Sequence, residues 1–203
     1  TVLEPGASWS ASAQTSAALS TKAPIVQLVA YRDETPRVLI RTITSLLHGT
    51  IVHDDGFRIR LHARMHTGTH LPTRQVDARP VPGAMHRAYA VDTHGTVREW
   101  DTATRRLTEL ASFEPVPEDR WWMLAPREPH TLFATSCYDI YTLDVRDPSP
   151  HTLLSMPYST DTLSRTHVTN MVASHLHAHL LAIATTDYVQ YYDVRYAHVP
   201  WHT

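Results

Sequence analysis

The stretch "AYAVDTHGTVREWDTATR", residues 88–105, decides the fold. Apolar residues lie on both sides of a "DTHG" turn, and the second half ends in the pair Trp100–Asp101. Short apolar runs separated by Asp and Gly are typical of two β-strands joined by a tight turn. The stretch therefore predicts an antiparallel hairpin whose second strand ends at Asp101.

Two later stretches repeat this pattern: "LFATSCYDIYTLDVRDPS" at 132–149 and "LAIATTDYVQYYDVRYAH" at 181–198. With Asp101, Asp144 and Asp193 aligned, the repeats are 43 and 49 residues apart. The apolar positions then match: Val97, Ile140 and Val189 four residues before the Asp, Trp100, Leu143 and Tyr192 directly before it, and Tyr89, Leu132 and Leu181 at the start of the preceding strand. A self-similar unit of about 40–50 residues made only of short strands is the signature of a β-propeller blade.

Counting units gives four, at 24–66, 85–113, 120–155 and 166–202. In the first, "PIVQLVAY" (24–31), "RVLIRTIT" (37–44) and the segment 46–65 around its "HDDG" turn read as four strands. Residues 67–84 are expected to form a long loop, and 1–22 a flexible Ser/Ala/Thr-rich lead-in to blades spanning 23–203. We predict an all-β, WD40-like β-propeller with about four blades. A closed ring usually needs more blades than four, typically up to about eight, so we expect the chain to be part of a larger protein.

The repeated Asp residues have a structural explanation. A carboxylate at a strand end accepts a hydrogen bond from a backbone N–H two residues later. In the two "DVR" sequences the Arg lies two residues beyond the Asp, so Arg146 and Arg195 are placed to pair with it. We therefore interpret these residues as turn stabilisers, and expect Trp100 and Tyr192 to lie in blade cores.

Composition excludes several classes of protein. The net charge of −2 gives no global basic field, and no apolar run approaches the ~18 residues of a transmembrane helix. The single cysteine, Cys137, rules out an internal disulfide and favours a reducing compartment. Charge is uneven: 56–87 holds six Arg against one Asp, and 88–147 holds eleven acids against six Arg. This is the pattern of solvated surface or, alternatively, of a polarised binding surface.

Motifs for chemistry are weak. His62 and His66 imitate the end of a zinc finger, but the two upstream thiolates are missing. His175, His177 and His179 would share one face of a strand, either as surface imidazoles or, alternatively, as zinc ligands. There is no G-x-S-x-G elbow or Gly-rich phosphate loop, and Cys137 is expected to be a small buried residue. We predict no catalytic, cofactor-binding or metal-binding residue, and no cofactor.

Four stretches carry a family resemblance: "APIVQLVAYRDETPRVLIRTITSLLHGTIV", "RAYAVDTHGTVREWD", "RWWMLAPREPHTLFATSCYDIYTLDVR" and "HLLAIATTDYVQYYDVRYAHVPWHT". Together they resemble, over 23–203, the WD-repeat subunit of the RNA polymerase I core factor of fungi. They are also similar to its animal counterpart, the largest TBP-associated subunit of the selectivity factor for ribosomal DNA.

The resemblance implies a non-enzymatic scaffold that supports transcription initiation at ribosomal RNA genes. Its implied partners are other core-factor subunits, among them a TFIIB-like one, and the RNA polymerase I machinery, in the nucleus and nucleolus. Weak contact with promoter DNA would involve the arginine-rich stretch: Arg58, Arg60, Arg64, Arg74, Arg79 and Arg87. The alternatives are a generic WD-repeat adaptor, acting as substrate receptor or in trafficking, and a propeller enzyme that uses a metal.

Overall fold

The computed structural model describes residues 23–32, 34–53, 57–66, 74–114, 121–155, 166–174, 176–177, 179–196 and 200. These residues form fifteen strands in four antiparallel sheets, and their only helical element is the 3-10 turn η1, Val194–Tyr196. The expected all-β propeller architecture is confirmed. The expected lead-in at 1–22 lies outside the described residues.

Each sheet is one blade, and we name the blades A to D in chain order. Blade A holds β1 (Ile25–Arg32), β2 (Pro36–Thr42), β3 (Ser45–His53) and β4 (Phe57–His66). Blade B holds β5 (Gln75–Pro80), β6 (Arg87–Asp92), β7 (Thr96–Asp101) and β8 (Arg106–Ser112). Blade C holds β9 (Met123–Glu128), β10 (Thr131–Thr135), β11 (Asp139–Asp144) and β12 (Asp147–Ser155). Blade D has three described strands, β13 (Val168–Ala173), β14 (Leu180–Thr185) and β15 (Val189–Asp193).

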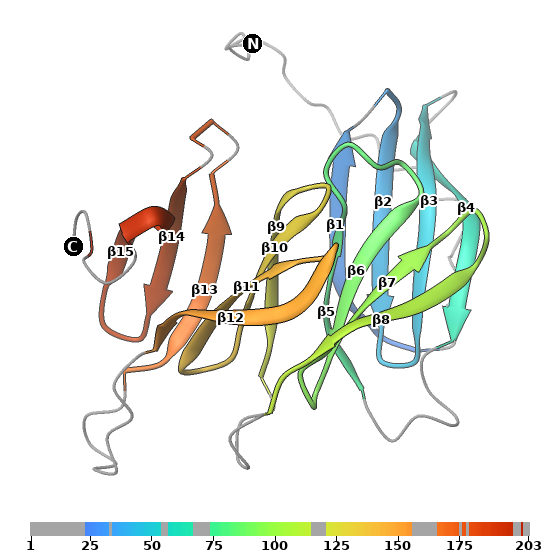
Figure 1. Cartoon of the computed structure of the whole chain (residues 1–203). Coiled ribbons are helices and arrows are strands. Elements are labelled where there is room, and N and C mark those ends of the chain that lie inside the picture. Colours follow the sequence, from blue (N-terminus) through green and yellow to red (C-terminus); the bar gives the residue numbers. More distant parts are fainter. Residues whose placement is uncertain are drawn as a thin grey trace, which may run out of the picture.

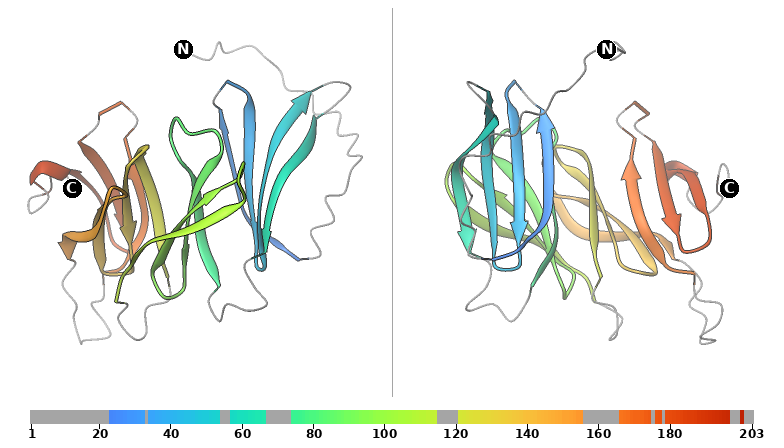
Figure 2. Two further views of the ribbon diagram at one scale, coloured as in Figure 1. Left: turned by 45° about the vertical axis from the view of Figure 1, so that its right-hand side comes forward. Right: turned by 180° about the vertical axis from the view of Figure 1, so that it is seen from behind.

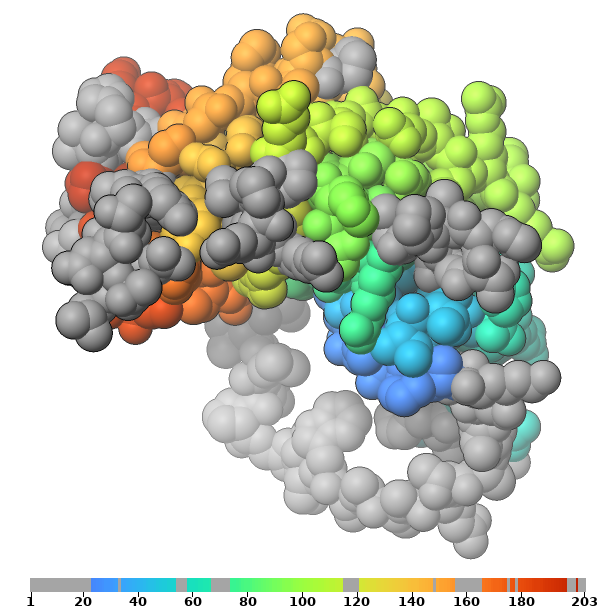
Figure 3. Space-filling view, turned by 90° about the horizontal axis from the view of Figure 1, so that it is seen from below, coloured from blue at the N-terminus to red at the C-terminus, as the bar shows by residue number. Residues whose placement is uncertain are grey.

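The blades stand side by side like the leaves of a fan (Figures 1 and 2). Within each blade the strands follow one another as an antiparallel meander. The first strands form the inner row, in which β5 contacts β1 and β9, and β9 contacts β13. In the space-filling view the coloured residues trace an arc from blade D through C and B to A (Figure 3).

Apolar clusters between the sheets hold the arc together. Between blades A and B, Trp100 packs with Leu39, Leu46 and the small residues of β5 and β6. Between B and C, Tyr89, Trp122 and Leu132 belong to the largest cluster. Between C and D lies the third cluster, which includes Phe133, Ile140, Leu181 and Tyr192. At roughly 25 cal/mol per Å² of apolar surface removed from water, these contacts supply the main stabilisation that a lone sheet lacks.

At the aligned repeat positions, each buried side chain faces a particular neighbouring blade. The residues directly before the repeated Asp, Trp100, Leu143 and Tyr192, are 1, 0 and 5% exposed, and each faces the preceding blade. The predicted place of Trp100 and Tyr192 in blade cores is confirmed. Val97 and Ile140, both 0% exposed, face the following blade. Val189 has the same place in blade D but is 50% exposed, because no described blade follows it.

Two details of the sequence interpretation of blade B are wrong. The expected loop at 67–84 contains strand β5, so blade B begins at Gln75 rather than at residue 85. The sequence of this strand contains polar and Pro residues and shows no apolar alternation. Its residues are buried because blades pack against it on both sides. The alignment of Tyr89 with Leu132 is also shifted by one. Ala88 is the residue opposite Trp100, as Leu132 is opposite Leu143, because the β6–β7 turn has five residues between its last paired residues and the β10–β11 turn has four.

The longer turn brings Gly95 against the indole of Trp122. Gly95 has a φ of +75°, and a Cβ placed there would lie 2.6 Å from Trp122 Cζ2. The indole cannot move away easily, since it stacks on Phe113 and Tyr141 with ring centroids 5.3 and 6.1 Å apart. Glycine is therefore required at this turn for its conformation and for space.

Gly95→Ala should consequently destabilise the protein more than Gly83→Ala. Gly83 has a similar φ of +69°, but its Cβ would meet only Pro129 Cγ at 3.8 Å. The left-handed conformation alone costs about 1–2 kcal/mol, and overpacking adds a further ~1–3 kcal/mol at Gly95. Urea unfolding of the two variants measures the difference, and equal losses would show that the indole yields to the new methyl group.

Candidate interaction site

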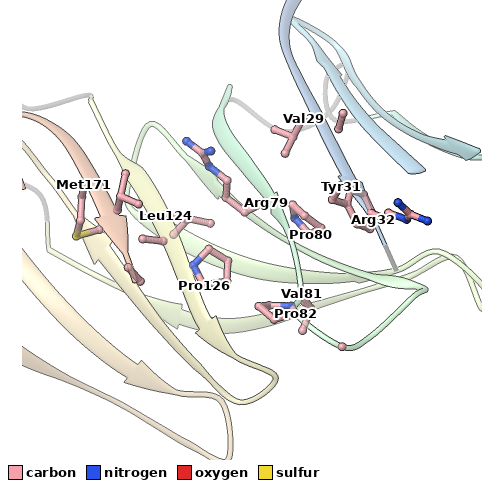
Figure 4. Close-up of a pocket in the computed structure, with 15 residues that line it drawn as sticks. Val29, Tyr31, Arg32, Arg79, Pro80, Val81, Pro82, Leu124, Pro126 and Met171 are labelled. Carbon is pink, nitrogen blue, oxygen red and sulfur yellow. The ribbon is translucent and has the colours of Figure 1, made fainter. Parts of the chain in front are cut away.

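The inner row of strands borders a pocket of about 440 Å³. Four segments line it, one from each blade: 29–32 of β1, 79–83 at the end of β5, 124–126 of β9 and 171–173 of β13. In Figure 4, Met171, Leu124 and Pro126 lie on one side, Val29, Tyr31 and Arg32 on the other, and Arg79 to Pro82 between them. Ligands usually bind in a concave site, and here all four described blades contribute lining residues.

The pocket wall is mostly apolar, with two cationic side chains. Pro80, Pro82 and Pro126 lack an N–H, which limits backbone pairing along these inner strand edges. Arg32 is exposed, whereas Arg79 donates from Nε to Asp77 Oδ2 at 3.1 Å. Such a surface suits a polypeptide segment with apolar side chains better than it suits a small polar substrate.

Behind this wall the carboxylate of Asp77, 4% exposed, connects three blades. From blade A it accepts a hydrogen bond from Gln27 Nε2, and from blade C it accepts the backbone N–H of Leu124 at 2.8 Å. Within its own blade it accepts Ala78 N–H at 2.9 Å as well as Arg79. A buried carboxylate with this many donors is well satisfied.

Gln27 extends the network into blade A. Its Oε1 accepts from Ala78 N at 3.1 Å and from Arg41 Nε at 2.9 Å. Arg41 also donates to the backbone oxygen of Gln75 at 2.9 Å. Burial lowers the pKa of Arg41, and the nearby Asp77 carboxylate opposes that effect. Sequence reasoning missed this network, although Asp77 is the one acid of the arginine-rich stretch 56–87.

The blade-end Asp residues confirm the turn interpretation. Asp101 accepts from Ala103 N at 2.8 Å, Asp144 from Arg146 N at 2.9 Å, and Asp193 from Arg195 N at 3.0 Å. The two "DVR" arginines also pair with their Asp, at 2.6 and 2.5 Å. The side-chain hydrogen bonds from Arg195 and its backbone N–H lower the pKa of Asp193 to about 2. Asp144 has its pKa lowered in the same way, and by more.

The candidate metal ligands do not converge in the described part of the chain. His62 bonds Thr50 and His66 contacts Ser45, and four residues of extended strand separate them by roughly 13 Å. The expectation that His177 and His179 lie on a strand is wrong, because both precede β14 in the β13–β14 connection. His175 lies outside the described residues. No group of three potential metal ligands occurs among the described residues.

The arginine-rich stretch divides among separate locations. Arg58, Arg60 and Arg64 lie on β4, at the outer edge of blade A. Arg79 pairs with Asp77 at the pocket, Arg87 pairs with Glu99 on β7, and Arg74 precedes β5. This stretch is therefore not one continuous basic surface. Cys137 lies in the β10–β11 turn and is half-buried rather than buried.

The outward face of blade D is a second exposed apolar surface, which meets the pocket at Val172. Val172, Ala182 and Tyr191 lie opposite one another on its three strands, and Val189 adjoins them on β15. Val172, Tyr191 and Val189 are 55, 42 and 50% exposed. The corresponding faces of blades B and C are covered by their neighbours. In blade D the same positions are apolar but exposed, as is typical of an interface.

Comparisons with known proteins support the fold. No protein-family model and no curated protein matches the chain. A chain of the "Crystal Structure of Mitotic Checkpoint Complex" is similar, with a TM-score of 0.58 and 16% identity over 85% of this chain and 49% of that one. A chain of the "COPII on membranes, outer coat vertex" has a TM-score of 0.60 and 15% identity over 81% of this chain and 45% of its own. This chain thus spans less than half the length of these WD40 β-propeller neighbours, and at these identities only the fold is shown.

No described helix is long and apolar enough to cross a membrane.

Removing the Asp77 carboxylate should loosen three blades together. Asp77→Ala leaves Leu124 N–H, Gln27 and Arg79 without their shared acceptor, so the free energy of unfolding should fall by about 3 kcal/mol or more. Asp193→Ala, which removes an exposed carboxylate bonded only within its own turn, is the control and should lose clearly less stability. Chemical unfolding compares the two, and similar small losses in both would mean that apolar packing alone sets the blade positions.

Asp193 should contribute stability that disappears in acid. Its pKa in the folded protein, about 2, lies below the ordinary value of 3.8, so the contribution is complete above pH 4 and is lost as the pH falls through 2. The difference in unfolding free energy between wild type and Asp193→Asn should follow this course. Denaturant titrations from pH 2 to 7 at low salt measure it. A difference that grows on acidification would contradict the assignment.

Proposed function

We propose that this chain is a protein-interaction scaffold and, more specifically, part of the WD-repeat subunit of the RNA polymerase I core promoter factor. The observation that carries the scaffold role is the arc of blades with a mostly apolar pocket at its inner row and an uncovered apolar face on blade D. Both surfaces offer rigid apolar area, which is the usual basis of protein recognition.

The finer assignment is supported by the order of the four resembling stretches. They fall on β1 to β3, β6 and β7, β9 to β11, and β14 to η1, so each belongs to a different blade. The proposed partners are other core-factor subunits, including a TFIIB-like one, and the polymerase I machinery, in the nucleus and nucleolus. In this proposal the chain has no enzymatic activity and its contact with promoter DNA is weak.

The second candidate is a generic WD-repeat adaptor. The neighbours in the mitotic checkpoint complex and the COPII coat are components of multi-subunit assemblies, which favours binding of partner proteins without specifying which ones. The two candidates share the same surfaces and differ only in the proteins that those surfaces hold.

Affinity purification of the parent protein with mass spectrometry tests the proposal. We expect a TFIIB-like subunit and polymerase I subunits in the eluate, and less ribosomal RNA precursor after depletion. Val172→Asp, which places a charge at the pocket rim, should reduce their recovery. Leu176→Asp is the matched control, since Leu176 is 89% exposed and lies outside the pocket lining. Recovery of vesicle-coat or ubiquitin-ligase components instead would favour the adaptor and overturn the polymerase I assignment.

A further inference from the structure

A buried guanidinium at the junction of blades A and B has no described anion beside it. Arg37, on β2, is 8% exposed. Its Nη1 donates to the backbone oxygen of Met85 at 3.0 Å and its Nη2 lies 3.3 Å from Met85 Sδ. Its Nε is buried and has no hydrogen-bond partner in the described part of the chain, and none of the described ion pairs includes Arg37. A buried charge without a counter-charge is costly.

A second orphaned nitrogen lies on the same face of blade A. His48 is 2% exposed, and its Nε2 is 2.7 Å from the hydroxyl of Tyr31. Its Nδ1 is buried with no partner among the described residues. In the β2–β3 pairing Arg37 is opposite Thr50 and His48 is opposite Leu39, so the two side chains are diagonal neighbours. When the Tyr31 hydroxyl donates to Nε2, Nδ1 carries the hydrogen and is a donor on the same face of blade A as Arg37.

The surroundings of these two nitrogens are cationic. Arg60 lies opposite Thr50 on the next strand, and the His62 ring is centred 6.3 Å from that of His48. Burial, Arg37, His62 and His86 together lower the pKa of His48 to about 4, so the ring is neutral at pH 7. The carboxylate of Asp101, which acts on His86, is already bonded by the N–H groups of Ala103 and Thr104.

We propose that Arg37 and His48 form a binding site for one oxyanion, the carboxylate of an Asp or Glu side chain on a partner protein. The Nε–H of Arg37 and the free hydrogen on Nη2 point along one edge of the guanidinium, which is the edge that binds a carboxylate through two parallel hydrogen bonds. The Nδ1–H of His48 supplies a third donor. The proposal rests on the scaffold function above, since it names the chemistry of one contact that the scaffold makes.

The small exposure of the site favours a carboxylate over a nucleic-acid backbone. A carboxylate is the terminal group of its side chain, so it can approach donors that leave only a small area exposed. A phosphodiester is flanked by sugars on both sides, and duplex DNA is held by rows of exposed cations rather than by one buried one. Arg60, the exposed arginine nearby, serves as a comparison for surface charge alone.

Thermal unfolding in sodium acetate tests the site, with sodium chloride at the same ionic strength as reference. Acetate binds the folded state only, so it should raise the Tm of the wild-type chain in a concentration-dependent way. Arg37→Met should abolish this rise. It should also leave the Tm in chloride no lower than wild type, because it replaces an unpaired buried cation with an apolar side chain of similar length. Arg60→Met, the control, should keep the acetate response.

Other results would overturn the proposal. A wild-type Tm that acetate does not change, or an Arg37→Met variant that is less stable in chloride, would give Arg37 a purely structural role through Met85. A response to sodium phosphate without one to acetate would replace the carboxylate with a phosphate group. Undiminished partner recovery with Arg37→Met, despite a normal acetate effect in wild type, would separate this site from partner binding and leave the scaffold function standing.

Discussion

The carboxylate of Asp77 accepts hydrogen bonds from three blades at once, and the positions of their inner strands depend on it. Apolar contacts between sheets are strong but non-directional, so they allow neighbouring blades to slide. Hydrogen bonds from Gln27 on one side and from Leu124 N–H on the other do not. A similar role falls to Tyr89, whose hydroxyl donates to the backbone oxygen of Pro129 at 2.9 Å and joins blade B to blade C.

The pocket is a consequence of this arrangement. Its four lining segments come from strands that are paired on one side only, and each strand alone is an ordinary sheet edge. The polar network lies behind the wall and leaves an apolar surface with Arg32 and Arg79 toward the pocket. Rigid walls reduce the entropy lost on binding, which is why a scaffold benefits from buried polar contacts that fix the positions of its strands.

The apolar face of blade D and the cation at the A–B junction differ in kind. The first is broad and non-directional, and suits another apolar sheet or a partner of similar character. The second is a single directional site in which one charge is recognised. A protein that assembles with partners gains affinity from surfaces of the first kind and register from sites of the second.

The sequence by itself determined the repeat and much of its packing. The strand-end Asp residues, the buried residue before each of them, and the strands of blade A could be predicted because alternation and turn chemistry are local properties. Strand β5 could not, since "QVDARP" shows no apolar alternation and is buried by the blades beside it. The direction of Tyr89 likewise depended on one extra turn residue that changed the register.

The candidate sites were decided by tertiary structure alone. Asp77 and Gln27 are 50 residues apart, and nothing in either local sequence indicates that they meet. In the sequence, Arg37 is an ordinary strand residue. In the structure, blade B covers it, and Met85 accepts two of its hydrogen bonds. The sequence therefore determined which faces of each strand are apolar, because that follows from residue type and a period of two. Only the stacking of blades decided which polar groups became buried, because burial depends on residues that are distant in the chain.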